Sequence, residues 1–191
     1  MRLFVALNLP GAARERIATE LLSPLAEQVP GVRWVLADTL HVTLAFLGER
    51  TEAEARDAER MLRELADGRA APTVTLRGLG VFPDVEQPRV VWLGIEKPAD
   101  VRTLHRAFER ERARLGLAAE GRAYHPHVTL GRVPPEIAPT AAAPLAKALE
   151  RSEFEMKVQL ASLDLMVSEL TPAGPRYTVL ADVPLVPQEV R

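Results

Sequence analysis

The sequence predicts an α+β fold of two lobes related by a pseudo-twofold axis, with antiparallel sheets flanking a central cleft and the helices on the outside. The main observation is the tetrapeptide His-Val-Thr-Leu, which occurs at His41–Leu44 and again 86 residues later at His127–Leu130. The order of elements is the second observation. Each half reads as helix, His-Val-Thr-Leu strand, helix, strand, turn and strand.

Two further segments recur in the same order, which makes coincidence a poor explanation. Apolar positions in 74–79 match those in 158–163, and 88–93 aligns with 175–180, at spacings of 84 and 87 residues. A period this long with only two copies indicates a duplicated half-domain and not a solenoid. We therefore expect one bilobal domain over residues 1–191, with halves at roughly 1–96 and 97–185.

The first half alternates between strand-like and helix-like hydrophobic patterns. An apolar run stopped by Pro10-Gly11 indicates a buried strand, and Thr51 with Glu54 has the spacing of a capping box at a helix start. The expected elements are strands at 3–9, 32–36, 41–48, 73–82 and 89–95, and helices at 12–28 and 51–68.

The second half repeats this pattern with different loops. We expect helices at 98–115 and 137–151, and strands starting at 127 and covering 154–160, 162–170 and 176–183, followed by a loose tail from Pro184. His105 lies in the 98–115 helix, where we interpret it as a packing or surface histidine.

Composition excludes several classes of protein. Apolar residues make up 47% and charged residues 26%, and the net charge is −2, so any nucleic-acid contact must be local. The absence of cysteine excludes disulfides, thiolate metal sites and cysteine nucleophiles. No stretch resembles a signal peptide or a membrane span, so we expect a cytoplasmic protein with no membrane partner.

The repeated strand carries the candidate chemistry. Alternation sends valine and leucine into the core and leaves histidine and threonine on the opposite face. Two such strands would bring His41, His127, Thr43 and Thr129 into one cleft. Paired imidazoles suit displacement at phosphorus, where one oxygen loses a proton and another gains one. The threonine hydroxyls, and Arg132 just beyond the second copy, could hold the charged oxygens.

A metal site is the competing interpretation of the same histidines. His125 and His127 have the spacing of two ligands on one strand face, and His41 could be a third. However, no acidic residue occupies matching positions in both copies, and position 39, which corresponds to His125, is Thr. We therefore expect no metal and no other cofactor.

These residues resemble the two-histidine (2H) phosphoesterases, and in particular the RNA 2′,3′-cyclic phosphodiesterases of the 2′-5′ RNA ligase family. The doubled His-x-Thr-x signature defines that family. The resemblance extends over most of the chain and includes the segments 2–7, 41–48, 88–94, 125–132 and 168–180.

The resemblance implies metal-independent hydrolysis of RNA 2′,3′-cyclic phosphate ends to 2′-phosphates, with possible reversible 2′-5′ joining of tRNA halves. It makes His41 the proton donor and His127 the proton acceptor, and it gives Thr43, Thr129 and Arg132 phosphate-binding roles. Strict alternation would turn Arg132 away from the cleft, so its role requires a bulge or the strand's end near Gly131.

The residues alone leave the assignment of acid and base open. They also leave open a non-catalytic module that binds RNA ends or nucleotides, and the metal-dependent site. The expected partners are RNA ends that carry a 2′,3′-cyclic phosphate, bound by a monomeric protein.

Overall fold

A computed structural model describes residues 1–118, 120–121, 123–171 and 174–188. In these residues nine strands join into one continuous sheet in which all the strand pairs are antiparallel. The strands are β1 (Arg2–Asn8), β2 (Arg33–Trp34), β3 (His41–Glu49), β4 (Thr73–Phe82), β5 (Val90–Glu96), β6 (His127–Arg132), β7 (Glu155–Gln159), β8 (Ser162–Thr171) and β9 (Gly174–Pro184).

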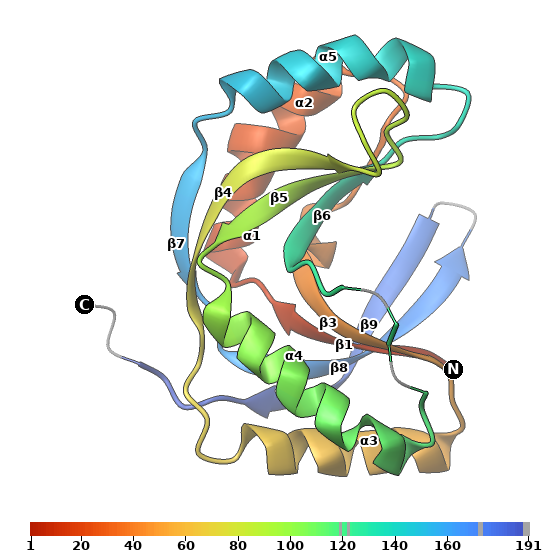
Figure 1. The fold of residues 1–191 in the computed structure, drawn as a ribbon, viewed down its shortest axis with the longest axis vertical. Coiled ribbons are helices and arrows are strands. Elements are labelled where there is room, and N and C mark those ends of the chain that lie inside the picture. Colours follow the sequence, from red (N-terminus) through yellow and green to blue (C-terminus); the bar gives the residue numbers. More distant parts are fainter. Residues whose placement is uncertain (119, 122, 172–173, 189–191) are drawn as a thin grey trace.

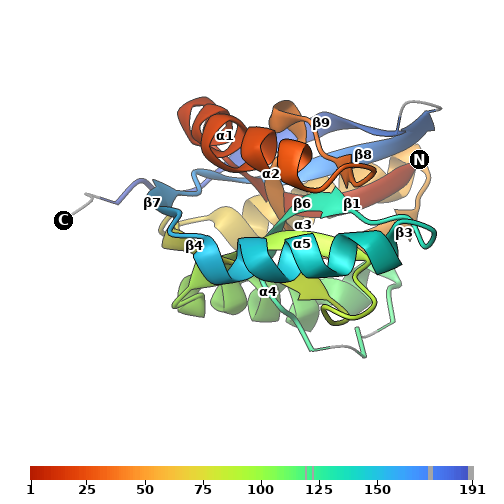
Figure 2. The same ribbon diagram turned by 90° about the horizontal axis from the view of Figure 1, so that it is seen from above.

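The helices lie at two ends of this sheet. Figure 1 shows α5 and the α1–α2 helix at one end and α3 and α4 at the other, and Figure 2 shows α1–α2 running alongside α5. The elements are α1 (Gly11–Ile17), a π-helical turn (Ala18–Leu22), α2 (Ser23–Gln28), a 3₁₀ turn (Ala37–Thr39), α3 (Glu52–Ala66), α4 (Ala99–Glu111), a 3₁₀ turn (Arg112–Leu115) and α5 (Ala138–Arg151).

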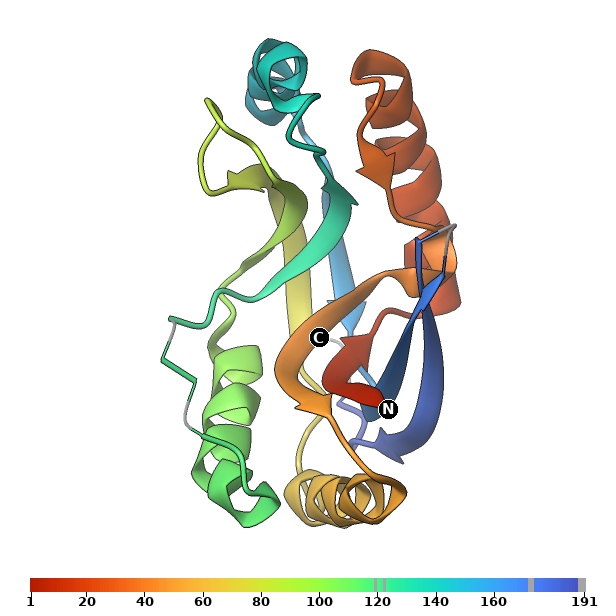
Figure 3. The same cartoon turned by 90° about the vertical axis from the view of Figure 1, so that its right-hand side faces the viewer.

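The sheet is divided into two lobes at a narrow seam. Its order is β7-β4-β5-β6 in the first lobe, here lobe A, and β3-β1-β8-β9 in the second, lobe B. β3 and β6 meet at the seam through one register pair, Val42 with Val128. Figure 3 shows the two groups of strands curving away from each other from that line. The predicted α+β fold with two antiparallel lobes is confirmed.

The lobes do not coincide with the halves 1–96 and 97–185. Lobe A takes β4, β5 and the short β2, which pairs with β6, from the first half and β6 and β7 from the second, whereas lobe B takes β1 and β3 with β8 and β9. Val74 and Val158, which match in sequence, are direct register partners in lobe A and do not lie in opposite lobes. Each lobe is therefore completed by both halves. The duplication of the chain itself stays a prediction.

The two repeated strands face the core as predicted. Val42, Val128 and Leu130 are fully buried, and Leu44 is almost so, within one apolar cluster that runs through both lobes. The capping box at the start of α3 is present, with Thr51 accepting from the Glu54 N–H and the Glu54 side chain accepting from Thr51.

The tail differs from its prediction. Leu185 is buried and its N–H donates to the Ala161 carbonyl at 2.8 Å, while the Val186 N–H donates to Arg69 at 2.7 Å. The expectation of a loose tail from Pro184 is wrong for these residues, because two backbone bonds and an apolar contact hold them. None of the helices in the described ranges is long and apolar enough to cross a membrane.

Candidate active site

The seam between the lobes brings the two histidine strands together. Val42 and Val128 are register partners and both are fully buried, so the residues on either side of them face away from the core. His41 and Thr43 therefore share one face with His127 and Thr129, and all four are half-buried. A positive charge on His127 lowers the pKa of His41, because two cations on one face of the seam repel each other.

Both imidazoles are anchored in the same way. Nδ1 of His41 lies 2.6 Å from the carbonyl oxygen of Thr39, and Nδ1 of His127 lies 2.7 Å from that of His125. Because a carbonyl can only accept, each Nδ1 carries a proton, and Nε2 is left to exchange one. Nε2 of His41 is 3.1 Å from the hydroxyl of Thr43, the first of the predicted hydroxyl partners.

The surroundings favour the neutral form of both rings. Burial lowers the pKa of His41, and the charge of His127 lowers it further, while the bond to Thr39 opposes the shift. Burial also lowers the pKa of His127, with smaller contributions from the charges of His125 and Arg132. An anion between the rings would reverse this effect by favouring their protonated forms.

The bulge that Arg132 requires is present. Thr129 pairs with Trp92, but Gly131 pairs with Val91, so β6 has one extra residue at this point. Arg132 then pairs with Val90, two residues from Trp92, and therefore lies on the same face as Thr129. Its effect on the pKa of His127 agrees with this position.

Aromatic side chains border each imidazole, and the sequence analysis missed them. The His41 ring is 5.2 Å from Phe4 and 5.3 Å from Tyr177. The His127 ring is 5.3 Å from Phe82 and 6.2 Å from Trp92. Phe4 and Trp92 are 88 residues apart, close to the spacing of the histidines, and this signal could have identified them.

His105 has the packing role predicted for it. Its ring stacks on Tyr124 at 3.9 Å, and its Nδ1 lies 3.0 Å from the Leu44 carbonyl. The hydroxyl of Tyr124 donates to the Thr43 carbonyl at 2.9 Å, and burial raises the pKa of that phenol. Together these residues brace β3 beside His41. No pattern in the sequence indicated the Tyr124 contact.

The three histidines of the metal alternative do not form a ligand set. The ring of His125 packs on Trp92 and Phe82, 6.3 Å from the ring of His127. Within the described ranges no group of three His, Cys, Asp or Glu side chains could hold a metal ion. The arrangement of donors therefore does not favour that alternative.

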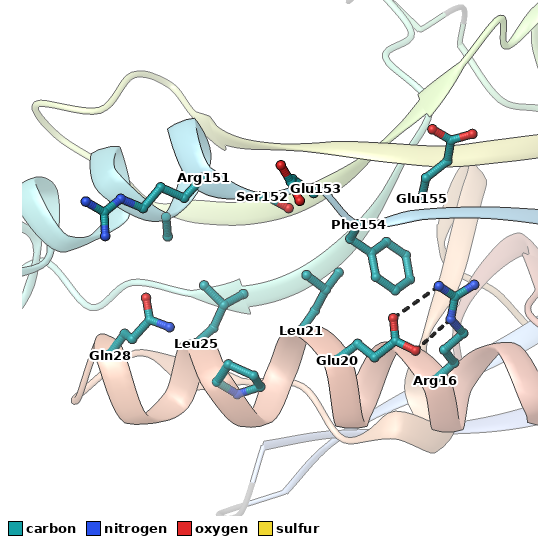
Figure 4. Close-up of a pocket in the computed structure, with 12 residues that line it drawn as sticks. Arg16, Glu20, Leu21, Leu25, Gln28, Arg151, Ser152, Glu153, Phe154 and Glu155 are labelled. Atoms are coloured by element: carbon teal, nitrogen blue, oxygen red, sulfur yellow. Dashed lines mark hydrogen bonds and ion pairs between the residues drawn. The ribbon is translucent and has the colours of Figure 1, made fainter.

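A pocket of about 390 Å³ lies away from the histidines, between the α1–α2 helix and the end of α5. Figure 4 shows Leu21, Leu25 and Phe154 between helix and strand, with Arg16 and Glu20 joined as an ion pair at one end. The pocket contains none of the predicted site residues. Its lining contains no histidine.

Known proteins resemble this chain over most of its length. Residues 13–171 match the model of the 2′-5′ RNA ligase superfamily. The chain is 34% identical to the RNA 2′,3′-cyclic phosphodiesterase of Methanothermobacter thermautotrophicus over 93% of this chain and 95% of that protein. It is 33% identical to the corresponding protein of Archaeoglobus fulgidus, covering 93% and 96% of the two chains.

Solved structures show the same fold. The structure of E. coli LigT complexed with 3′-AMP has a TM-score of 0.74 and 29% identity, covering 96% of this chain and 97% of that one. A Thermus thermophilus protein has a TM-score of 0.75 and 30% identity, covering 97% and 98% of the two chains. The chain belongs to the 2′-5′ RNA ligase superfamily.

Proposed function

We propose that this protein hydrolyses RNA 2′,3′-cyclic phosphate ends to 2′-phosphomonoesters without a metal, using His41 and His127 as an acid–base pair. Its family and its curated relatives make the chain a cyclic phosphodiesterase. The observation that carries the mechanism is the matched anchoring of the two imidazoles, each held through Nδ1 by the carbonyl two residues before it.

The proposed reaction is one in-line displacement at phosphorus. Nε2 of His127 takes a proton from a water molecule as the water oxygen bonds to phosphorus. The bond from phosphorus to the ribose 3′ oxygen breaks, and Nε2 of protonated His41 supplies the proton to that oxygen. The assignment of donor and acceptor follows the family resemblance, since the local geometry of the two rings is nearly the same.

The remaining groups hold the charge that builds up on phosphorus. The hydroxyls of Thr43 and Thr129 would donate to the non-bridging oxygens, where fixed donors act most strongly in the transition state. Arg132 lies on the same face and would contribute a charged contact. The lowered pKa values of both histidines suit acid–base catalysis, because the bound phosphate anion raises these pKa values towards those needed for proton exchange.

Ligation would use the same groups in the same roles. His127 takes the proton of an RNA 5′ hydroxyl as its oxygen bonds to phosphorus, and His41 protonates the departing ribose 3′ oxygen, which leaves a 2′-5′ linkage. In the reverse reaction, cleavage of that linkage, the two histidines exchange roles. We propose RNA ends, including tRNA halves, as the physiological partners, bound by a single copy of the chain.

The test is incubation of the purified protein with a nucleoside 2′,3′-cyclic phosphate in EDTA, with identification of the product isomer. We expect a 2′-phosphate. His41→Ala and His127→Ala should each lower turnover by roughly 10²-fold or more, with the double variant little worse.

His125→Ala is the matched control, because it removes an imidazole beside the site and leaves the backbone carbonyl that anchors His127. The acid–base mechanism predicts a modest effect for this variant. A loss as large as that of His127→Ala, with activity restored by Zn²⁺ or Mn²⁺, would instead favour a metal site. Binding of a 2′-nucleotide without any turnover of cyclic phosphates would indicate a non-catalytic binding module.

A further inference from the structure

A pocket of about 390 Å³ lies beside His41 on the inner face of lobe B. It shares residues with the surroundings of that histidine, because Thr39 anchors the imidazole and the ring of Tyr177 packs against it. Side chains of β1, β8 and β9, including Asn8, Asp164 and Asp182, line it together with residues of α1 and of the loops next to these elements.

The carboxyl group of Asp164 is an unusual feature of this pocket. Asp164 is 1% exposed, and its Oδ2 accepts from the side chain of Asn8 at 2.5 Å and from its backbone N–H at 3.3 Å. Its other oxygen, Oδ1, is buried without a donor among the residues that the structure describes. Burial, reinforced by the charge of Asp182, raises the pKa of Asp164, while the side chains of Ser162 and Asn8 oppose the shift. A carboxyl group held in this way weakens the fold and needs an explanation outside it.

The fold itself does not require this polar pair. Asn8 is the register partner of His41, and Gly94 is the register partner of His127 in the other lobe. Asp164 is the register partner of Ala6, and the corresponding pair in lobe A is Gly80 with Trp92. Lobe A therefore builds the same architecture with glycine at both positions, Gly94 and Gly80.

The position of the pocket relates it to the nucleoside that carries the phosphate. In the mechanism proposed above, on which this inference rests, His41 protonates the departing ribose oxygen. The ribose of the substrate therefore lies on the His41 side of phosphorus, and its base extends further into lobe B. The pocket lies on that side, and its volume is sufficient for a base.

The polar groups of the pocket select among the bases. Asp38, Asp164 and Asp182 line it, with Arg14 as its one guanidinium among the described residues, and the Arg14 side chain already donates to the backbone of Asp38. Such a lining repels phosphate and favours a base edge rich in hydrogen-bond donors. Guanine presents two adjacent donor groups, N1–H and N2–H₂, whereas uracil presents one N–H between two carbonyl oxygens.

We propose that this pocket binds the base of the nucleoside 2′,3′-cyclic phosphate and prefers guanine to uracil, with Oδ1 of Asp164 and the Asp182 carboxylate as acceptors. Asp164 and Asp182 are register partners on neighbouring strands, so their side chains share the face that lines the pocket.

The experiment compares kcat/KM for guanosine and uridine 2′,3′-cyclic phosphates and for a methyl riboside 2′,3′-cyclic phosphate that has no base. We expect the wild-type protein to favour guanosine over uridine by about tenfold or more. In Asp164→Asn the amide oxygen can keep the bond from Asn8 and the amide N–H₂ takes the place of Oδ1, so an acceptor becomes a donor. This variant should lose the preference for guanosine and turn over the baseless substrate as the wild type does.

Two controls separate this proposal from the function on which it rests. Asp182→Asn changes the exposed member of the pair and should also reduce the preference, whereas Asp67→Asn, an exposed site outside the pocket, should not. Equal kcat/KM for guanosine and uridine in the wild type would overturn the base subsite and leave the hydrolase intact. An equal loss on all three substrates in Asp164→Asn would make its role structural and likewise overturn it. Failure of the wild type to hydrolyse any of the three would instead refute the proposed function.

Discussion

Replacing Asp164 by asparagine should change how stability depends on pH. The pKa of Asp164 is raised in the folded protein, chiefly by burial. The contribution of the protonated carboxyl to stability is therefore fully present below the unfolded pKa of about 3.9 and is lost as the pH rises through the folded value. Asparagine has the same shape and never ionises, so Asp164→Asn removes this loss.

The expected size follows from the unpaired oxygen. A buried acceptor without a donor costs about 1–3 kcal/mol, and an ionised one costs more than a neutral one. Since the amide still leaves one buried group unpaired, the gain at neutral pH should be on the order of 1 kcal/mol. That corresponds to a rise of about 2–4 °C in the unfolding midpoint for a chain of this size.

The assay is thermal unfolding of the wild type and Asp164→Asn, followed by circular dichroism between about pH 4 and pH 8. The unfolding midpoint of Asp164→Asn should rise relative to that of the wild type as the pH rises, and the midpoint of Asp67→Asn should follow that of the wild type throughout. If Asp164→Asn were the less stable protein by the same margin at both ends of the range, the carboxylate would be a structural group and the reasoning would fail.

Three other outcomes follow from the site and its supports. Because burial lowers the pKa of both His41 and His127, the bell-shaped profile of kcat/KM against pH should peak on the acid side of 6.5. The profile of kcat should peak at higher pH, because the bound phosphate raises the pKa of both histidines. Gly80→Ala should lower the free energy of unfolding by about 1–3 kcal/mol and should also lower kcat/KM, because the new methyl group would overlap the indole of Trp92 beside His127. Denaturant unfolding measures the first effect and steady-state kinetics the second. Thr51→Ala should cost about 1 kcal/mol in denaturant unfolding and leave kcat unchanged, because it removes only the cap of α3.

The sequence was informative where the chemistry depends on local alternation. His41, Thr43, His127 and Thr129 reach one face because a strand has a period of two, and the burial of the intervening valines and leucines makes that face unambiguous. The need for a bulge at Arg132 could also be stated in advance, because the residue has the wrong parity for the cleft without one.

The groups that support the site could not be predicted, because their partners are distant in the chain. The Asn8 side chain meets Asp164 across 156 residues, and the Tyr124 hydroxyl meets the Thr43 carbonyl across 81. No periodic pattern in the sequence around these residues predicts either contact. The pairing of β4 with β7 was missed for a related reason: two matching segments read equally well as symmetry mates or as neighbours, and only the sheet order distinguishes these cases.

The interleaving of the two halves explains how the fold can hold two proton-transfer groups in a fixed relation. Only one register pair, Val42 with Val128, joins β3 to β6, so the seam alone would be a weak hinge. However, β6 is held in lobe A by β5 of the first half, and β1 of lobe B is paired with β8 of the second half. Opening the cleft would disturb packing in a core that continues through both lobes. The imidazoles are thus positioned by the whole sheet, which is the preorganisation that acid–base catalysis on two sides of one phosphorus requires.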